Sequence, residues 1–298
     1  MCDIFDEIDS KLLYNMASKA INITKLEILY LPLCLNIHQN MTNQNLYNQI
    51  LNAKKTGEKK FVVLIDPDKV RLGKINKVLE IAVESGVDYF FIGGSLVVND
   101  MLDYVLKSMK EMCNIPMILF PGNSFQLSYK ADGLLFLSLI SGRNADLLIG
   151  KHVITAPFLK VSPLEIIPTG YMLIDGGIMT SVQYMSNTNP IPSNKDDIAL
   201  CTAMAGEMLG LKQIYMDAGS GAKNPIPESM INTVSGGINI PLIVGGGIAT
   251  PEKAAANARA GADVIVVGNA IEKDPQLIKE ISIAVHEQSV SSKKEALQ

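Results

Sequence analysis

The chain has 298 residues, 48% of them hydrophobic, and a formal net charge of −4. The acidic balance argues against nucleic acid as the main partner, because phosphate backbones attract clustered lysine and arginine. The four cysteines are scattered without C-x-x-C spacing, which argues against a zinc site or a disulfide framework and predicts a cytoplasmic protein. No apolar run has the roughly 20 residues of a membrane-spanning helix, so membrane contact is expected to be at most peripheral.

The first 40 residues are expected to be an N-terminal helical extension. Apolar side chains at helical spacing predict a short amphipathic helix over 5–16. Residues 1–40 are either an accessory segment or the product of an upstream start codon, because Met41 stands directly before the next predicted helix.

Residues 41–298 are expected to form one domain. A helix is predicted over 41–55, with Thr42 or Asn43 as its N-cap. The lysines in 54–60 are interpreted as a solvated linker, with an anionic membrane surface as the alternative.

From residue 61 onward, short apolar runs alternate with segments of helical character. Most runs lack polar alternation, which is typical of strands covered on both faces in a parallel sheet. The predicted strands are 61–66, 89–94, 116–122, 134–140, 170–177, 213–219, 241–247 and 264–269. The predicted helices include 71–85, 100–112, 196–210, 251–260 and 275–287. Eight strands with interleaved helices predict an α/β fold, a (β/α)8 TIM barrel, with an open doubly wound sheet as the alternative.

Glycines end the last two predicted strands. Gly245, Gly246 and Gly247 end the seventh strand, and Gly268 and Asn269 end the eighth. Phosphate often binds at these two strand ends in such barrels, where backbone N–H groups and the positive ends of the following helices face the ligand. The pattern therefore predicts a phosphate site; the alternative is that these glycines only make tight turns.

The sixth predicted strand ends in "YMDAGSGA", residues 215–222. Tyr215, Asp217, Ser220 and free amides there are expected to complete the phosphate site and to place a carboxylate beside the ligand. The alternative is that Asp217 serves as a local turn residue.

Acidic residues follow the first predicted strand. Asp66 and Asp68 stand there, and Ser95 follows the second strand. One or two such oxygen ligands, with substrate oxygens and water, make a common Mg²⁺ site. Asp68 capping the next helix or pairing with Lys69 is the structural alternative.

Seven motifs in chain order resemble geranylgeranylglyceryl phosphate synthase, in the longer-chain group that has bacterial and archaeal members. They are "LIDPDK", "FIGGS", "FPGNSFQLS", "LISGRNADLLIGKHV", "YMDAGSGA", "VGGGIATPEKA" and "VVGNAIEKD". The resemblance covers about residues 42–290, and its motifs lie at nearly every predicted strand end.

The resemblance implies a Mg²⁺-dependent prenyltransferase. Such enzymes join the 3-hydroxyl of sn-glycerol 1-phosphate to C1 of geranylgeranyl diphosphate, form an ether and release diphosphate. Asp66 and Ser95 would hold Mg²⁺, and Asp217 and Tyr215 are the catalytic candidates. The implied substrate-binding residues are Tyr215, Met216, Asp217, Ala218, Gly219, Ser220, Gly221, Gly246, Gly247, Gly268 and Asn269. A homo-oligomer, dimer or hexamer, is also implied.

Two positions depart from the family pattern. Glu is the commoner family residue at Asp217, and the shorter-chain branch carries Lys where this chain has Leu64. Asp in place of Glu shortens the reach of the carboxylate by one methylene. Leu64 in place of Lys affects the assignment to the longer-chain or shorter-chain group of the family more than the activity. Arg143 is a further candidate for the diphosphate, and His152 is either a second one or structural.

Two other function classes share the phosphate site. One is a TIM-barrel isomerase or lyase of another small phosphorylated metabolite, with a small polar pocket and a second acid/base group. The other is a phosphate-ligand binding protein without catalysis. A long apolar groove for the prenyl tail would distinguish the transferase from the first of these.

Overall fold

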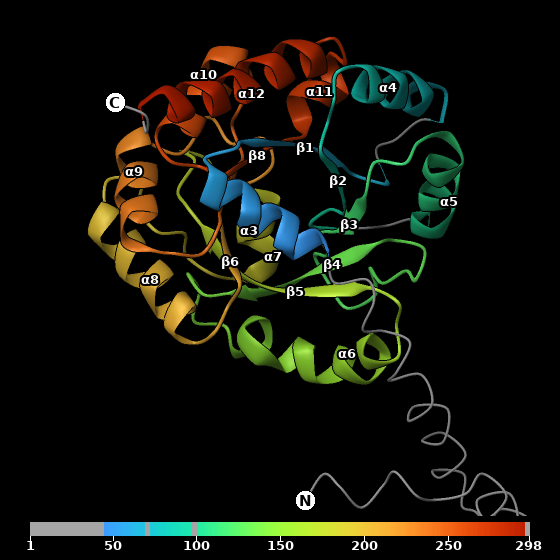
Figure 1. Ribbon diagram of the computed structural model, residues 1–298. Coiled ribbons are helices and arrows are strands. Elements are labelled where there is room, and N and C mark those ends of the chain that lie inside the picture. The colour runs from blue at the N-terminus through green and yellow to red at the C-terminus, as the bar shows by residue number, and fades with distance from the viewer. Residues whose placement is uncertain (1–44, 69–71, 97–100, 296–298) are drawn as a thin grey trace, which may run out of the picture. The chain divides into compact units, whose positions relative to one another are not determined.

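Eight parallel strands close into a barrel in simple chain order, with β8 pairing back onto β1 (Figure 1). The computed structural model describes residues 45–68, 72–96 and 101–295. The predicted TIM barrel is confirmed. The expected helix over 5–16 and the extension 1–40 lie outside the described residues, as do the expected caps Thr42 and Asn43.

Each predicted strand corresponds to an observed one. The strands are β1 (Lys60–Ile65), β2 (Tyr89–Ile92), β3 (Met117–Leu119), β4 (Gly133–Leu139), β5 (Glu165–Leu173), β6 (Gln213–Asp217), β7 (Leu242–Gly245) and β8 (Val264–Val267). The prediction was wrong at the start of β5, which begins five residues before 170. Glu165 and Pro168 interrupt the apolar run there, although Pro168 is in register with Phe136 of β4.

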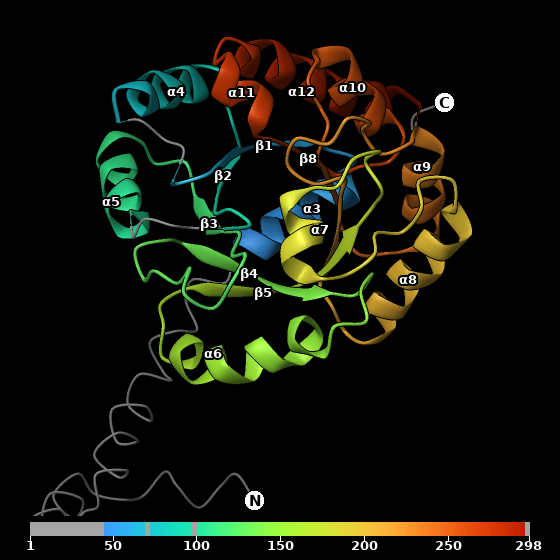
Figure 2. The same ribbon diagram turned by 180° about the vertical axis from the view of Figure 1, so that it is seen from behind.

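Helices surround the strands, most of them on the outside of the barrel (Figures 1 and 2). They are α3 (Leu46–Thr56), α4 (Leu72–Glu84), α5 (Leu102–Met112), the π-helical turn η2 (Asp146–Gly150), α6 (Lys151–Lys160), α7 (Ser181–Ser186), α8 (Asp196–Met208), α9 (Glu228–Gly237), α10 (Pro251–Arg259), α11 (Asn269–Lys273) and α12 (Leu277–Glu295). All five helices predicted after β1 are present. The described segment 120–132, between β3 and β4, contains no helix.

Successive strand residues alternate between two apolar clusters. On β6, Ile214 and Met216 pack with the surrounding helices, whereas Tyr215 packs inside the barrel. This alternation follows from the period of two in a strand. It directs Asp217, the last residue of β6, toward the barrel axis, into the cavity described below.

The helix α3 lies across one end of the barrel, and α7 lies over the other (Figures 1 and 2). The carboxylate of Glu165 caps α3 from a distant strand, since it accepts hydrogen bonds from the backbone N–H groups of Asn45, Leu46 and Tyr47 at 2.8–3.0 Å. Ile50 of α3 is fully buried against the barrel interior.

The interpretation of residues 54–60 as a solvated linker is wrong. Lys54 belongs to α3 and its Nζ lies 3.1 Å from Oδ2 of Asp263, while Lys60 opens β1 and pairs with Asp88 at 3.0 Å. These lysines hold the closing helix and the first strand to the barrel.

Candidate active site

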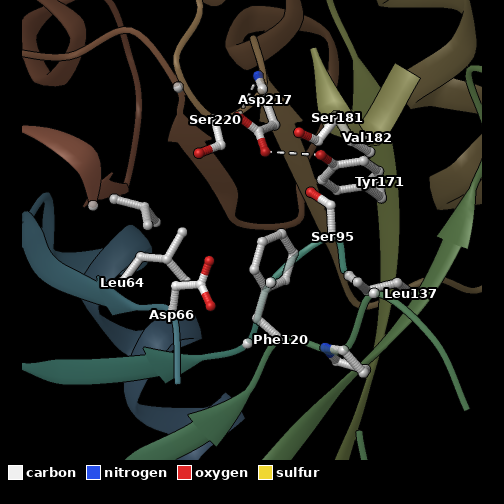
Figure 3. Close-up of a pocket in the computed structure, with 18 of the residues that line it drawn as sticks. Leu64, Asp66, Ser95, Phe120, Leu137, Tyr171, Ser181, Val182, Asp217 and Ser220 are labelled. Carbon is white, nitrogen blue, oxygen red and sulfur yellow. Dashed lines mark hydrogen bonds between the residues drawn. The ribbon is translucent and has the colours of Figure 1, made fainter. Parts of the chain in front are cut away.

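A cavity of about 790 Å³ opens at the carboxyl ends of the strands. Figure 3 shows Asp66 and Asp217 on opposite sides of it, with Ser95 between them. Of the thirteen residues that the family resemblance implies for metal, catalysis and substrate binding, eleven line it: Asp66, Ser95, Tyr215, Asp217, Gly219, Ser220, Gly221, Gly246, Gly247, Gly268 and Asn269. Met216 and Ala218 do not line it, because alternation along the chain turns their side chains into the layer between barrel and helices.

The carboxylate of Asp217 is buried and held from two sides. Its Oδ2 accepts a hydrogen bond from the Tyr171 hydroxyl at 2.7 Å, and its Oδ1 accepts one from the backbone N–H of Gly219 at 2.7 Å. Burial raises the pKa of Asp217 above its ordinary value, while these two hydrogen bonds act in the opposite direction. A carboxylate with a raised pKa is a better proton acceptor.

Tyr215 forms part of the cavity floor. Its ring stacks on Phe120 at 5.1 Å between centroids and meets Tyr171 edge-on at 5.6 Å. Its hydroxyl passes so close to Gly245 that a Cβ at that position would lie only 2.6 Å from it. Burial and the charge of Asp217 raise the pKa of Tyr215 well above 10, so the phenol stays protonated and cannot act as a base at neutral pH.

The glycine-bearing ends of β6, β7 and β8 meet around one part of the cavity. Gly219, Gly221, Gly246 and Gly247 all have positive φ between 70° and 89°. A Cβ on Gly246 would lie 2.5 Å from Oδ1 of Asp217 and 2.6 Å from the backbone nitrogen of Ala218. Only glycine therefore allows the β7 corner to approach the Asp217 corner this closely.

Side chains and helix ends complete this glycine-rich corner. Ser220 donates a hydrogen bond to Oδ1 of Asn269 at 2.9 Å, which joins the β6 loop to the end of β8. Thr250 caps α10 by accepting from the N–H of Lys253 at 3.3 Å, and α11 begins at Asn269. Helices therefore begin after both β7 and β8, as expected. The free N–H groups at their N-termini favour an anion.

The part of the lining that carries Asp66 and Ser95, just after β1 and β2, is here called the oxygen-rich corner. The Asp66 carboxylate packs against Gly94, where a Cβ would lie 3.1 Å from its oxygens, and its Oδ1 accepts from the N–H of Asp68 at 3.1 Å. Asp68 is not among the lining residues. Within the described ranges, no group of three or more His, Cys, Asp or Glu side chains forms a metal cluster. One carboxylate and one hydroxyl nevertheless fit Mg²⁺, which commonly takes one or two protein ligands together with phosphate oxygens and water.

An apolar branch of the cavity extends along β4. Leu135, Leu137 and Leu139 line it from the inner face of the strand, and Leu134 and Phe136 from the outer face. The positions from Leu134 to Leu139 span about 17 Å at the usual strand rise of roughly 3.3 Å per residue.

The opposite wall of this branch comes from α6 and η2. Leu147, Lys151, His152, Thr155 and Leu159 line it. The residues of β4, η2 and α6 thus give this part of the cavity a mostly apolar lining, on the inner face of β4 as well as on the face where Phe136 packs against His152 of α6.

His152 and Arg143 differ in their placement. His152 packs edge-on against Phe136 at 4.4 Å, and burial lowers its pKa, so it stands neutral in the apolar branch. Arg143 donates to the carbonyl oxygen of Gly142 at 2.8 Å and does not line the cavity. The geometry does not favour Arg143 as a contact for the diphosphate.

The chain matches the PcrB family over residues 54–285, more than half of its length. It belongs to the PcrB family. It is 57% identical over 244 residues to geranylgeranylglyceryl phosphate synthase of Chitinophaga pinensis, covering 82% of this chain and 97% of that one. It is 41% identical over 224 residues to the enzyme of that name from Thermococcus kodakarensis, covering 75% and 88%. The resemblance read from the sequence motifs is thereby confirmed, with bacterial and archaeal relatives.

Solved structures agree with this PcrB assignment. The crystal structure of (S)-3-O-geranylgeranylglyceryl phosphate synthase from Thermoplasma acidophilum, in complex with substrate sn-glycerol-1-phosphate, aligns with a TM-score of 0.78 and 31% identity. The alignment covers 82% of this chain and 99% of that one. The wild-type protein from Thermoplasma volcanium aligns with a TM-score of 0.76 and 34% identity, covering 82% and 98%.

One polar residue of the site in this PcrB chain was not predicted from the sequence. Tyr171 lines the cavity and binds the carboxylate of Asp217, yet it stands 46 residues earlier on β5. The available signal was its inward-facing position near the end of a strand that neighbours β6 in a chain-ordered barrel.

Proposed function

We propose that this chain is a prenyltransferase that joins sn-glycerol 1-phosphate to geranylgeranyl diphosphate and releases diphosphate. The carrying observation is that one cavity joins the glycine-rich corner, the buried Asp217 carboxylate, the oxygen-rich corner and the apolar branch. A small polar metabolite would leave the branch along β4 unused, which disfavours the isomerase or lyase alternative.

The glycine-rich corner is proposed to hold the phosphate of glycerol phosphate. Backbone N–H groups near Gly246 and Gly268 and the N-terminal ends of α10 and α11 supply hydrogen bonds and positive potential without long cationic side chains. Holding the phosphate there fixes the glycerol beside Asp217, which lowers the entropic cost of attack.

Asp217 is proposed to accept the proton of the attacking 3-hydroxyl. The oxygen forms a bond to C1 of the prenyl chain as the bond from C1 to diphosphate breaks, and the proton passes to the carboxylate. Tyr171 and Gly219 orient that carboxylate through the two hydrogen bonds at 2.7 Å. The protonated Tyr215 and Phe120 shape the floor and limit water beside the developing allylic cation.

Asp66 and Ser95 are proposed to hold Mg²⁺ at the diphosphate end. When bound there, the ion would neutralise charge that develops on the leaving diphosphate oxygens. The residues of the β4 and α6 walls then take the apolar tail, which has no hydrogen-bonding groups and is favoured there by the hydrophobic effect.

The enzyme is further proposed to act in the cytoplasm as a homo-oligomer. Among the described helices, none is long and apolar enough to span a bilayer. The outer face of α6 exposes Val153, Ile154 and Phe158 by more than half each, and the next barrel helix, α8, exposes Met208. Apolar patches on outer helices usually mark interfaces, and a second copy of the chain is the proposed occupant.

Product analysis tests the proposed activity. Full-length protein is incubated with Mg²⁺, sn-glycerol 1-phosphate and prenyl diphosphates of increasing length, and products are identified by mass. A prenyl ether of glycerol phosphate is expected, with sn-glycerol 3-phosphate as a poorer acceptor. Asp217→Asn is expected to lower kcat by about 100-fold or more. Absence of an ether with every chain length would contradict the proposal.

A further inference from the structure

The side chain of Gln126 joins two loops at the rim of the cavity. It follows β3 in the helix-free connection, is 5% exposed and lines the cavity. Its Nε2 donates to the carbonyl oxygen of Gly94 at 2.7 Å. Its Oε1 accepts from the N–H groups of Gly94 at 3.3 Å and of Gly122 at 3.2 Å. One amide thus satisfies three backbone groups of the loops after β2 and β3.

These loops touch backbone to backbone at this point. A Cβ on Gly122 would lie 2.4 Å from the carbonyl oxygen of Gly94 and 3.0 Å from the Cα of Ser95. Neither loop has room for a side chain there, and neighbouring strands alone do not align their loops. The amide of Gln126 is the side-chain group that hydrogen-bonds to both backbones at this contact.

The same contact places the proposed metal ligands. Gly94 has Gln126 on one side and the carboxylate of Asp66 on the other, where a Cβ would lie 3.1 Å from both Asp66 oxygens. Ser95 is the next residue along the chain. A shift of the Gly94 backbone would change the separation between the Ser95 hydroxyl and the Asp66 carboxylate.

We propose that Gln126 is a positioning residue that fixes the backbone of Gly94 and Ser95 relative to Asp66, so that the Ser95 and Asp66 side chains bind one divalent cation. This inference rests on the proposed function for its metal, and it adds a residue that touches neither the reacting atoms nor the cation. Outer-shell partners of metal ligands typically contribute 10- to 100-fold in metal affinity.

The test uses Gln126→Met, which keeps the length of the side chain and removes all three hydrogen bonds. Mn²⁺ is the probe, and its binding to the full chain without substrates is measured by electron paramagnetic resonance. The expected result is about 10-fold weaker Mn²⁺ binding and a similar rise in the Mg²⁺ concentration for half-maximal activity. The KM for sn-glycerol 1-phosphate at saturating Mg²⁺ is expected to stay within about twofold, because the glycine-rich corner is untouched.

Amide hydrogen exchange gives a readout independent of turnover. The N–H groups of Gly94 and Gly122 are expected to exchange faster in Gln126→Met, while that of Gly219 keeps its wild-type rate. The matched control is Gln276→Leu, an exposed glutamine outside the cavity, which is expected to change none of these quantities. If Gln126→Met does not fold, Gln126→Asn, which keeps the amide one methylene short, is measured in the same way.

Wild-type Mn²⁺ binding in a folded Gln126 variant would overturn the proposal, as would a loss of glycerol phosphate affinity equal to the loss of metal affinity. The binding and exchange measurements do not depend on product formation. Failure of the wild-type chain to make an ether would therefore count against the proposed function and leave the Gln126 result readable.

Discussion

The hydroxyl of Tyr171 donates a 2.7 Å hydrogen bond to Oδ2 of Asp217, and both groups are buried within the barrel. The two residues lie on neighbouring strands, where Tyr171 is in register with Tyr215 and Leu173 with Asp217. Because the N–H of Gly219 binds the other oxygen, the carboxylate has little rotational freedom. The strand pairing thus fixes the orientation of the proposed base before substrate arrives.

Tyr171→Phe is expected to move the acidic limb of the pH profile to higher pH. Asp217 acts as the carboxylate, so activity is lost as pH falls through its pKa, which burial has already raised. The Tyr171 hydrogen bond favours the charged form, and removing it raises that pKa further. The measurement is kcat against pH, with about a tenfold loss expected near neutrality. Tyr184→Phe, on an exposed tyrosine of α7, should leave the profile unchanged.

Gly246→Ala is expected to weaken glycerol phosphate binding, whereas Gly236→Ala is expected to leave it unchanged. At Gly246 φ is +80° and an added Cβ would lie 2.5 Å from Oδ1 of Asp217, whereas at Gly236 in α9 no atom lies within 4 Å. Gly246→Ala should weaken glycerol phosphate binding at least tenfold in calorimetry. Gly236→Ala should bind normally and gain about 0.5–1 kcal/mol of stability from helix propensity. Equal affinities would count against the close approach of the two corners.

Thr155→Phe is expected to shorten the longest prenyl diphosphate accepted. Thr155 lines the apolar branch from α6, so a larger side chain there occupies space proposed for the tail. The ratio of kcat/KM for a C20 to a C10 substrate should fall about tenfold or more, since one blocked pocket typically costs one to three kcal/mol. Val153→Phe, on the exposed face of the same helix, should keep the wild-type ratio. An unchanged ratio in Thr155→Phe would place the tail elsewhere.

Glu165→Gln is expected to destabilise the closed end of the barrel without changing the chemistry. The substitution turns one accepting oxygen into a donor against the N–H groups at the start of α3. A loss of about 1–3 kcal/mol in the free energy of unfolding is expected from urea titration. Glu228→Gln, at the exposed start of α9, should lose less than about 1 kcal/mol. An undisturbed unfolding midpoint in Glu165→Gln would show that the cap contributes little.

Phe158→Lys is expected to reduce the oligomeric state. It places a charge on the exposed apolar face of α6, where burial against a second copy would leave that charge unpaired. Light scattering coupled to size exclusion measures the mass, and Lys107→Glu on the outer face of α5 serves as a charge-change control. A wild-type chain that is monomeric at micromolar concentration, or a Phe158→Lys variant of unchanged mass, would contradict the assignment of this surface.

Local patterns predicted the barrel and most of the rim. The apolar runs located all eight strands, and the glycines that end β7 and β8 do line the same cavity as Asp217. These features can be predicted because a buried strand appears in the sequence as a short apolar run, and a tight strand end appears as adjacent glycines.

Features that depend on distant pairings were not predicted. Glu165 caps α3, which lies about 120 residues away in the chain. Tyr171 on β5 donates a hydrogen bond to Asp217 on the adjacent strand β6. The segment 146–160 was not predicted as helical because it is apolar on two faces, one toward the cavity and one outward, so it lacks amphipathic periodicity. Such contacts are decided by tertiary packing.

The apolar branch is lined by both faces of β4 and by η2 and α6, so part of it lies outside the ring of strands. The compartment proposed for the tail is thus lined by segments that carry none of the proposed proton-transfer or cation-binding groups. Substitutions in the single helix α6 can therefore lengthen or shorten this compartment and leave the reacting centre as it is.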